Sequence, residues 1–177
     1  MEIPWLLFIY KVPAVPSRHR VALWRAVKLS GAIYLQNSVC IMPDSEKSRA
    51  LFQVLAAQIR EAGGESICLL ATGLDESENE KIIQKFNFQR DQEYGEVIEQ
   101  CQAFLEEICR ETDRQNFSFA ELEENQSNLE RLETWFERIS GRDFFGSKQK
   151  DVAASWLERC RSALERFAST VYEREGN

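Results

Sequence analysis

The spacing of the apolar residues changes once along this chain, near residue 74. Before that point, short apolar runs that favour β-strands, such as Trp5–Tyr10 and Ile67–Ala71, alternate with amphipathic stretches. After that point, apolar residues recur every three or four positions, and no proline follows Pro43. This longer period is typical of helices, which rarely hold an internal proline. We therefore expect two regions, a mixed one over residues 1–74 and a helical one over residues 75–177.

The first region predicts a β-α-β-β-α-β order. Strands are expected over residues 5–10, 33–35, 39–42 and 67–71. Ser17 is expected to cap a helix that ends at Gly31, and Asp44 or Ser45 to cap a second helix that ends at Gly63. This order is that of the ferredoxin-like arrangement, an α+β fold with a four-stranded antiparallel sheet and two helices on one face.

The first expected strand is apolar on both of its faces. Its alternating positions hold Trp5, Leu7 and Ile9 on one face and Leu6, Phe8 and Tyr10 on the other. A sheet with one face in water would alternate apolar and polar residues instead. Two helices on one face therefore leave an apolar face that needs a cover. A homodimer partner and the chain's own helical tail are the two candidates.

The second region predicts three helices packed as an antiparallel bundle. They are expected over about residues 78–113, from Ser118 to about residue 139, and from about residue 149 to 171. Ser118 and Glu121 have the spacing of a capping box, which marks a helix start. Apolar residues spaced by three and four over many turns favour helix-on-helix packing.

Charge is unevenly distributed along the 177 residues, whose net charge is −7. Residues 1–60 carry a net of +5 and residues 61–177 a net of −12. The longest apolar run, Trp5–Tyr10, is far shorter than the roughly 20 residues of a membrane helix. Glu2 stands where a signal peptide would be basic. We expect a cytoplasmic protein with no membrane contact.

Reactive groups are sparse. The five cysteines form no CxxC pair and are interpreted as buried thiols in a reducing compartment. A single histidine makes a catalytic triad or a His-rich metal site improbable. The sequence holds no P-loop, GxGxxG or GxSxG motif. Adjacent glutamates of the tail do not converge on a helix and predict a solvated face. We expect no enzyme activity, no metal and no cofactor.

The stretch from Tyr10 to Gly31 is the most informative for function, because its charged side chains are all basic. On a helix, Arg18, Arg25 and Lys28 share one face, and Leu23, Trp24 and Val27 share another that should meet the sheet. The first turn holds Arg18, His19 and Arg20, where free backbone N–H groups favour an anion. The candidate binding residues are Lys11, Arg18, His19, Arg20, Arg25 and Lys28.

Three interpretations of this basic stretch remain open. Nucleic-acid phosphate is the commonest large partner of such a surface. A small oxyanion such as chromate, sulfate or phosphate would fit the first turn equally well. The same residues would also serve simply to keep an exposed helix face soluble.

Four segments carry a resemblance to a known family. WLLFIYKVPAVPSRHRVALWRAVKLSGAIYLQNSVCIMP (residues 5–43), FNFQRDQEYGEV (86–97), FSFAELEE (117–124) and RDFFGS (142–147) resemble the N-terminal domain of ChrB, the chromate-resistance regulatory protein. The resemblance implies a bacterial cytoplasmic regulator of a chromate-efflux operon, in which the basic stretch would contact DNA. Longer members of that family continue into a second domain to which chromate sensing is ascribed. Because this sequence stops at Asn177, we do not expect it to sense chromate directly.

A remoter resemblance tests the enzymatic alternative. The pattern of Tyr10, a basic loop, a helix and LQNSV (residues 35–39) is also similar to the CRISPR-associated small nuclease subunits and to PaaX-type repressors. In the nuclease family an acidic residue at the end of the first strand binds the metal. Lys11 stands at that position here, and its charge would repel Mg²⁺. The sequence therefore favours phosphate binding without nuclease chemistry.

The working hypothesis is a non-enzymatic regulator of chromate resistance that binds nucleic acid through its basic N-terminal region. The helical tail would supply a homodimer or helical-partner contact. A protein-interaction module that binds no DNA and a binder of chromate or sulfate are the alternatives.

Overall fold

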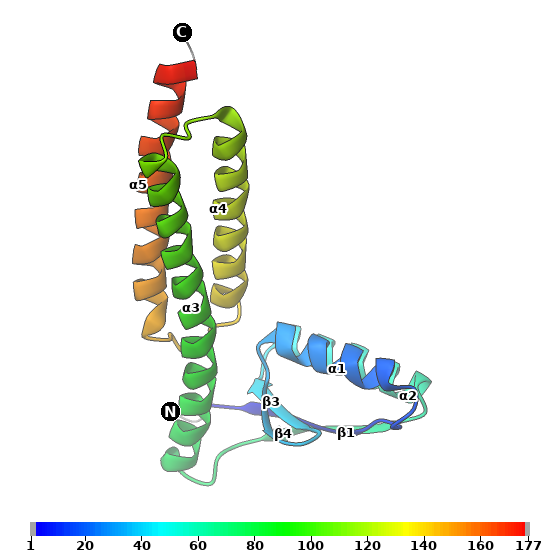
Figure 1. The fold of residues 1–177 in the computed structure, drawn as a ribbon. Coiled ribbons are helices and arrows are strands. Elements are labelled where there is room, and N and C mark those ends of the chain that lie inside the picture. Colours follow the sequence, from blue (N-terminus) through cyan, green and yellow to red (C-terminus); the bar gives the residue numbers. More distant parts are fainter. Residues whose placement is uncertain (1–2, 176–177) are drawn as a thin grey trace. The chain divides into compact units, whose positions relative to one another are not determined.

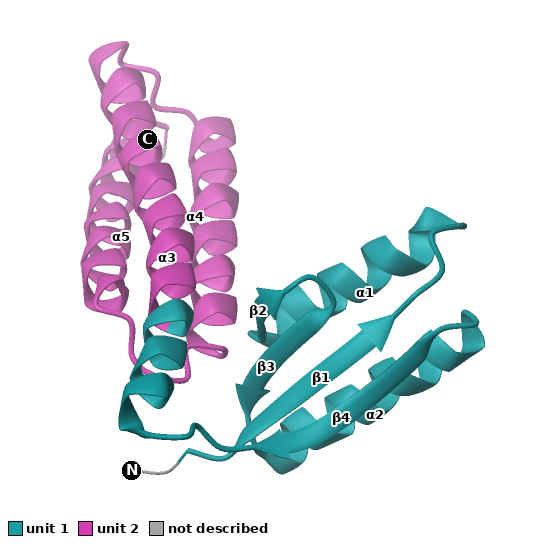
Figure 2. Cartoon of the chain, turned by 90° about the horizontal axis from the view of Figure 1, so that it is seen from below, with its two compact units in different colours: residues 1–86 teal, residues 87–177 magenta. Residues whose placement is uncertain are grey.

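The computed structural model describes residues 3–175 and has an α+β fold (Figure 1). The elements are β1 (Trp5–Lys11), α1 (Ser17–Ser30), β2 (Ile33–Gln36), β3 (Val39–Pro43), α2 (Glu46–Glu61), β4 (Glu65–Ala71), α3 (Glu76–Asp113), α4 (Phe119–Ser140) and α5 (Gln149–Glu175). The chain divides into two compact units, residues 1–86 and 87–177 (Figure 2). The predicted ferredoxin-like sheet followed by helices is confirmed.

The sheet of the first unit has the strand order β2-β3-β1-β4, and all neighbours are antiparallel. β1 is therefore a central strand, hydrogen-bonded to a neighbour along both of its edges. In its register, Leu7 lies between Ile41 of β3 and Leu69 of β4. β2 and β4 are the two edges. Ser38, with φ of 63°, forms the tight turn of the β2–β3 hairpin.

One face of this sheet is covered by α1 and α2, which lie side by side on it (Figure 2). Phe8 of β1 is fully buried there and stacks on Phe52 of α2, with ring centroids 4.7 Å apart. The α2 helix begins where Ser45 caps it, because the Ser45 Oγ accepts a hydrogen bond from the Ser48 backbone N–H at 3.1 Å. This settles the choice between Asp44 and Ser45 as the cap.

The opposite face of the sheet is partly covered by the first turns of α3, which belong to the same unit. The Trp5 ring stacks on Phe86 at 5.8 Å, and its Nε1 donates a hydrogen bond to the Asn79 Oδ1 at 2.8 Å. At the β4 edge, by contrast, Ile67 is 59% exposed and Leu69 is 46% exposed. The chain's own helix thus covers the Trp5 end of this face, while the β4 edge stays open.

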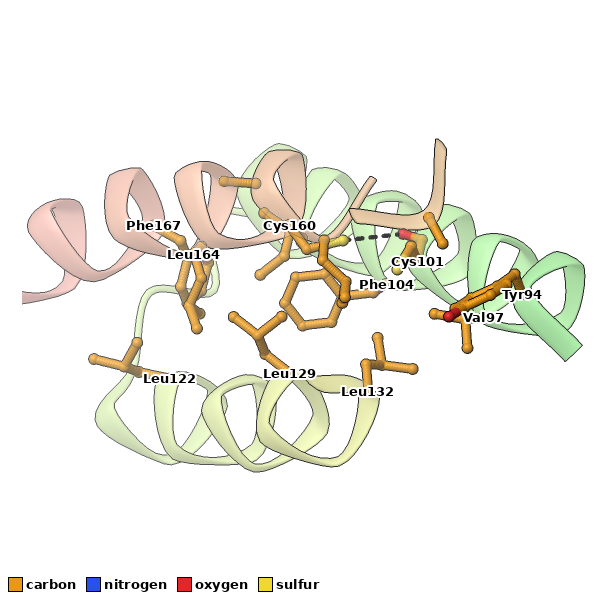
Figure 3. Packing of buried hydrophobic residues seen from close by; sticks show 14 of the residues in the cluster. Tyr94, Val97, Cys101, Phe104, Leu122, Leu129, Leu132, Cys160, Leu164 and Phe167 are labelled. Carbon is orange, nitrogen blue, oxygen red and sulfur yellow. Dashed lines mark hydrogen bonds between the residues drawn. The ribbon is translucent and has the colours of Figure 1, made fainter. Parts of the chain in front are cut away.

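The second unit is a bundle of three helices formed by the rest of α3 with α4 and α5 (Figure 1). Its core contains Phe104 of α3, Leu129 of α4 and Phe167 of α5 (Figure 3). The predicted cap at Ser118 is present, since its Oγ accepts a hydrogen bond from the Glu121 backbone N–H at 3.3 Å. Within residues 3–175, no helix is both long enough and apolar enough to cross a membrane.

Two of the local predictions are wrong. Ser17 does not cap α1, because it already lies inside the helix. The cap position is Pro16, whose backbone is extended and whose side chain forms no capping hydrogen bond. The five cysteines are free thiols, but only Cys40, Cys101 and Cys160 are buried. Cys68 lies on the edge strand and Cys109 on α3, and both are exposed.

Thiol labelling checks this division of the cysteines. In dilute native protein we expect Cys68 and Cys109 to react with a disulfide reagent while the three buried thiols do not. Burial raises the pKa of Cys40 to about 12, so its thiolate is scarce at pH 8. Partial burial also raises the pKa of Cys68, so its labelling should reach full rate only at a higher pH than that of an ordinary thiol. Rapid labelling of all five cysteines without denaturant would contradict this burial pattern.

Candidate nucleic-acid interface

The basic stretch begins where β1 ends against the turn between α2 and β4. Gly64 makes this close approach possible, because a Cβ there would lie 2.3 Å from the Lys11 carbonyl oxygen. Lys11 itself is exposed and lies opposite Glu65 in the strand register. Five residues, 12–16, then lead from β1 into α1.

The rotation of α1 about its own axis is fixed by burial of one face. Leu23 and Val27 are the buried residues of the helix and face the sheet. Gly31 ends the helix with a left-handed backbone, φ 86°, which a residue with a side chain rarely adopts. The positions opposite Leu23 and Val27 are consequently turned to solvent.

The cationic side chains of α1 are exposed. Arg18, Arg25 and Lys28 lie on the face away from the sheet. Arg20 lies on the same side of the helix as Val27, two turns earlier, and is exposed near the start of the helix. Among residues 3–175, no acidic side chain forms an ion pair with Lys11 or with these four residues. Their charges are therefore available to an external anion.

Trp24 is placed differently from the sequence prediction. It is 50% exposed and is not a core residue. The reason is helix geometry, since successive residues differ by about 100° around the axis and Leu23 occupies the middle of the buried face. Lys28, one turn later, lies over the Trp24 ring, with its Nζ 5.5 Å from the ring centroid. Trp24 thus belongs to the exposed basic face. In the sequence, its i, i+4 spacing with Lys28 already indicated that the ring and the lysine are neighbours on the helix surface.

We define the α1 surface as six of the exposed residues of the helix: Arg18, Arg20, Val21, Trp24, Arg25 and Lys28. Arg20, Trp24 and Lys28 follow one another at intervals of one turn, so the aromatic ring lies between two cations along the helix. The surface combines positive charge with an exposed aromatic ring. Phosphate contacts and base stacking need this combination.

His19 lies apart from the α1 surface. It is half-buried and lines a cleft of about 280 Å³ between α1 and α2, together with Gln58 and Glu61 of α2. The structure therefore brings Arg18, Arg20, Arg25 and Lys28 onto one helix, leaves Lys11 at the end of β1, and turns His19 towards α2. Over residues 3–175, no cluster of three or more His, Cys, Asp or Glu side chains could hold a metal ion.

Comparison with known proteins places the chain in a family. The family described as "Protein ChrB, N-terminal" matches residues 20–177. The chain belongs to this ChrB N-terminal family. It is also 28% identical over 95 residues to "Protein ChrB" of Cupriavidus metallidurans, a match that covers 54% of this chain and 29% of that protein. No solved structure is significantly similar.

The ChrB N-terminal match includes most of the α1 surface but begins after Lys11, Arg18 and His19. It also includes three of the segments that carried the resemblance, residues 86–97, 117–124 and 142–147. The second unit brings residues 87–97 and 142–147 together. Glu93 of α3 accepts hydrogen bonds from Arg90 at 3.1 Å and from Arg142 at 2.9 Å.

This Arg90–Glu93–Arg142 cluster is nearly inaccessible to solvent. Burial of the Arg90 guanidinium lowers its pKa, and the carboxylate of Glu93 opposes that shift. The carboxylate links α3 to the connection between α4 and α5, so it holds the bundle together at that end. We assign these ChrB-like residues to the packing of the bundle, because Glu93 accepts hydrogen bonds from both guanidinium groups inside it. The Arg90 Nε and Nη1 are buried there without a hydrogen-bond partner among the described residues.

Proposed function

We propose that this chain is a non-enzymatic regulatory protein of chromate resistance that binds nucleic acid through the α1 surface. Membership of the ChrB N-terminal family supports the regulatory role. The chain matches less than a third of its C. metallidurans relative, so the role concerns this region of such proteins.

The proposal rests on the cationic side chains of α1, which form no ion pair within residues 3–175 although the chain has a net charge of −7. Acidic residues outnumber basic ones, yet within residues 3–175 none pairs with Arg18, Arg20, Arg25 or Lys28. Elsewhere, Arg49 is held by Asp44 at 2.6 Å and Arg161 by Glu133 at 2.5 Å. A row of unpaired cations on a helix about 21 Å long matches the repeating charge of a nucleic-acid backbone.

Binding would proceed by phosphate contact. Arginine presents several N–H donors in a plane and suits phosphate oxygens, whereas Lys11 and Lys28 act as point charges. Each contact releases condensed counterions from the nucleic acid, which makes affinity depend steeply on salt. Trp24 adds an aromatic face on which an unpaired base can stack.

The salt dependence of binding tests the phosphate contacts. For five contacts, we expect the logarithm of the association constant for a duplex to fall with the logarithm of salt concentration with a slope of about −4.5. Arg18→Ala with Arg25→Ala should reduce this slope by about 2, because two contacts are lost. Fluorescence anisotropy with DNA from upstream of the gene measures both.

The matched control is Lys47→Ala with Arg60→Ala, which removes the same charge from exposed positions of α2. The control should bind with an unchanged slope. Absence of binding at low salt, or an equal loss in the two double variants, would refute the α1 surface as the interface. Displacement of the DNA by millimolar chromate but not by chloride would instead identify a small-oxyanion site.

A second variant series tests the role of Trp24. Trp24→Ala should weaken binding of a single-stranded oligonucleotide by about 5- to 150-fold, since base–aromatic stacking contributes roughly 1–3 kcal/mol. Trp24→Phe keeps an aromatic face and should retain most of the affinity. Equal affinity of the wild type and Trp24→Ala for single strands would show that this ring takes no part in binding.

A further inference from the structure

The β4 strand is an unprotected sheet edge. It has no neighbour on its outer side, because the strand order ends with β4. Its side chains are exposed on both faces of the sheet: Leu70 is 61% exposed, Cys68 is exposed, and Ile67 and Leu69 are open as described above. Natural proteins usually blunt such an edge with lysine, proline or a bulge. The β4 sequence ESICLLA contains neither residue, and its register with β1 is unbroken.

The direction of its backbone groups follows from the hydrogen bonds of β1. The Tyr10 N–H donates to the Ser38 carbonyl at 3.0 Å, and the Pro4 carbonyl accepts from the Asp44 N–H at 2.9 Å. Even-numbered residues of β1 thus turn their backbone towards β3, and odd-numbered residues turn theirs towards β4. Leu7 and Ile9 therefore pair with Leu69 and Ile67.

It follows that Ser66, Cys68 and Leu70 turn their backbone N–H and C=O groups outward, away from the sheet. These three residues are spaced symmetrically about Cys68. The strand is consequently its own complement in an antiparallel arrangement. A second copy with Cys68 opposite Cys68 places Ser66 of each copy opposite Leu70 of the other, and every outward group finds a partner.

We propose that a second copy of this chain pairs with β4 across a two-fold axis at Cys68, so that two four-stranded sheets become one continuous sheet. On one face, Ile67 of each copy then lies beside Leu69 of the other, which buries the exposed apolar side chains. This interface is isologous, the commonest kind in homodimers.

Charge favours a second copy over a charged peptide as the occupant. Residues 66–71 carry no charge, so two chains of net charge −7 can meet along β4 without placing like charges opposite each other. The single charged residue of the strand, Glu65, lies at its end and faces Ala71 of the other copy in this register. A strongly basic or acidic strand would find no counter-charge within residues 66–71 of β4.

The arrangement has a consequence for the α1 surface. A two-fold axis perpendicular to the sheet leaves the helices of both copies on the same face, so two α1 surfaces are presented on one side of the dimer. This consequence rests on the proposed nucleic-acid role, whereas the dimer itself does not. The experiments below therefore use the full chain without nucleic acid.

A proline at Cys68 tests the pairing. Cys68→Pro removes an outward N–H and no hydrogen bond to β1, and proline is tolerated at such edge positions. The pair of copies loses two hydrogen bonds, so we expect the dimer dissociation constant to rise about 10- to 100-fold. The matched control, Cys68→Val, keeps the N–H and an apolar side chain and should dimerise like the wild type. Sedimentation velocity over a range of concentrations separates the 20.5 kDa monomer from a dimer of twice that mass.

Cross-linking locates the two-fold axis. In a Cys109→Ser background, Cys68 is the remaining cysteine that is exposed among residues 3–175. A short bismaleimide should then join two chains, and the product should disappear when Cys68→Val is added. A wild type that stays monomeric at all concentrations would overturn the proposal. So would a dimer that is unaffected by Cys68→Pro and not cross-linked at Cys68.

Discussion

Burial of Leu23 and Val27 against the sheet is the interaction on which the functional surface depends. These two side chains fix which way α1 is rotated, and the rotation decides which residues meet solvent. Arg18, Arg25 and Lys28 are exposed because they lie on the far side of the same helix. The apolar residues that build the core therefore also position the charges that would bind phosphate.

Much of the fold could be predicted from local patterns. The order of strands and helices followed from the period of the apolar residues. The two apolar faces of β1 are explained by α1 and α2 on one side and by the first turns of α3 at the Trp5 end of the other. Ser118 and Gly31 were recognisable as helix ends because caps depend on neighbouring residues alone. The single helix predicted over about residues 78–113 corresponds to α3, which runs unbroken from Glu76 to Asp113.

The candidate site was predicted only in part, because exposure depends on packing at a finer scale than the pattern. Trp24 is large and apolar, so its sequence favoured the core, yet it lies about 100° from Leu23 and falls outside the buried face. Cys68 lies within the apolar run Ile67–Ala71 and was expected to be buried. Its exposure results from the edge position of β4, which becomes visible only once the strand order is known.

The two proposed surfaces lie on different elements of the first unit, the cationic one on α1 and the apolar one on β4, and each has its own chemistry. Nucleic-acid binding by the cationic surface can be measured by acetylating lysines in the full chain with and without nucleic acid and quantifying each site by mass spectrometry. We predict that nucleic acid slows modification of Lys11 and Lys28 several-fold and leaves Lys47 of α2 unchanged. Equal acetylation rates at Lys28 with and without bound nucleic acid would show that the α1 surface is not the binding site.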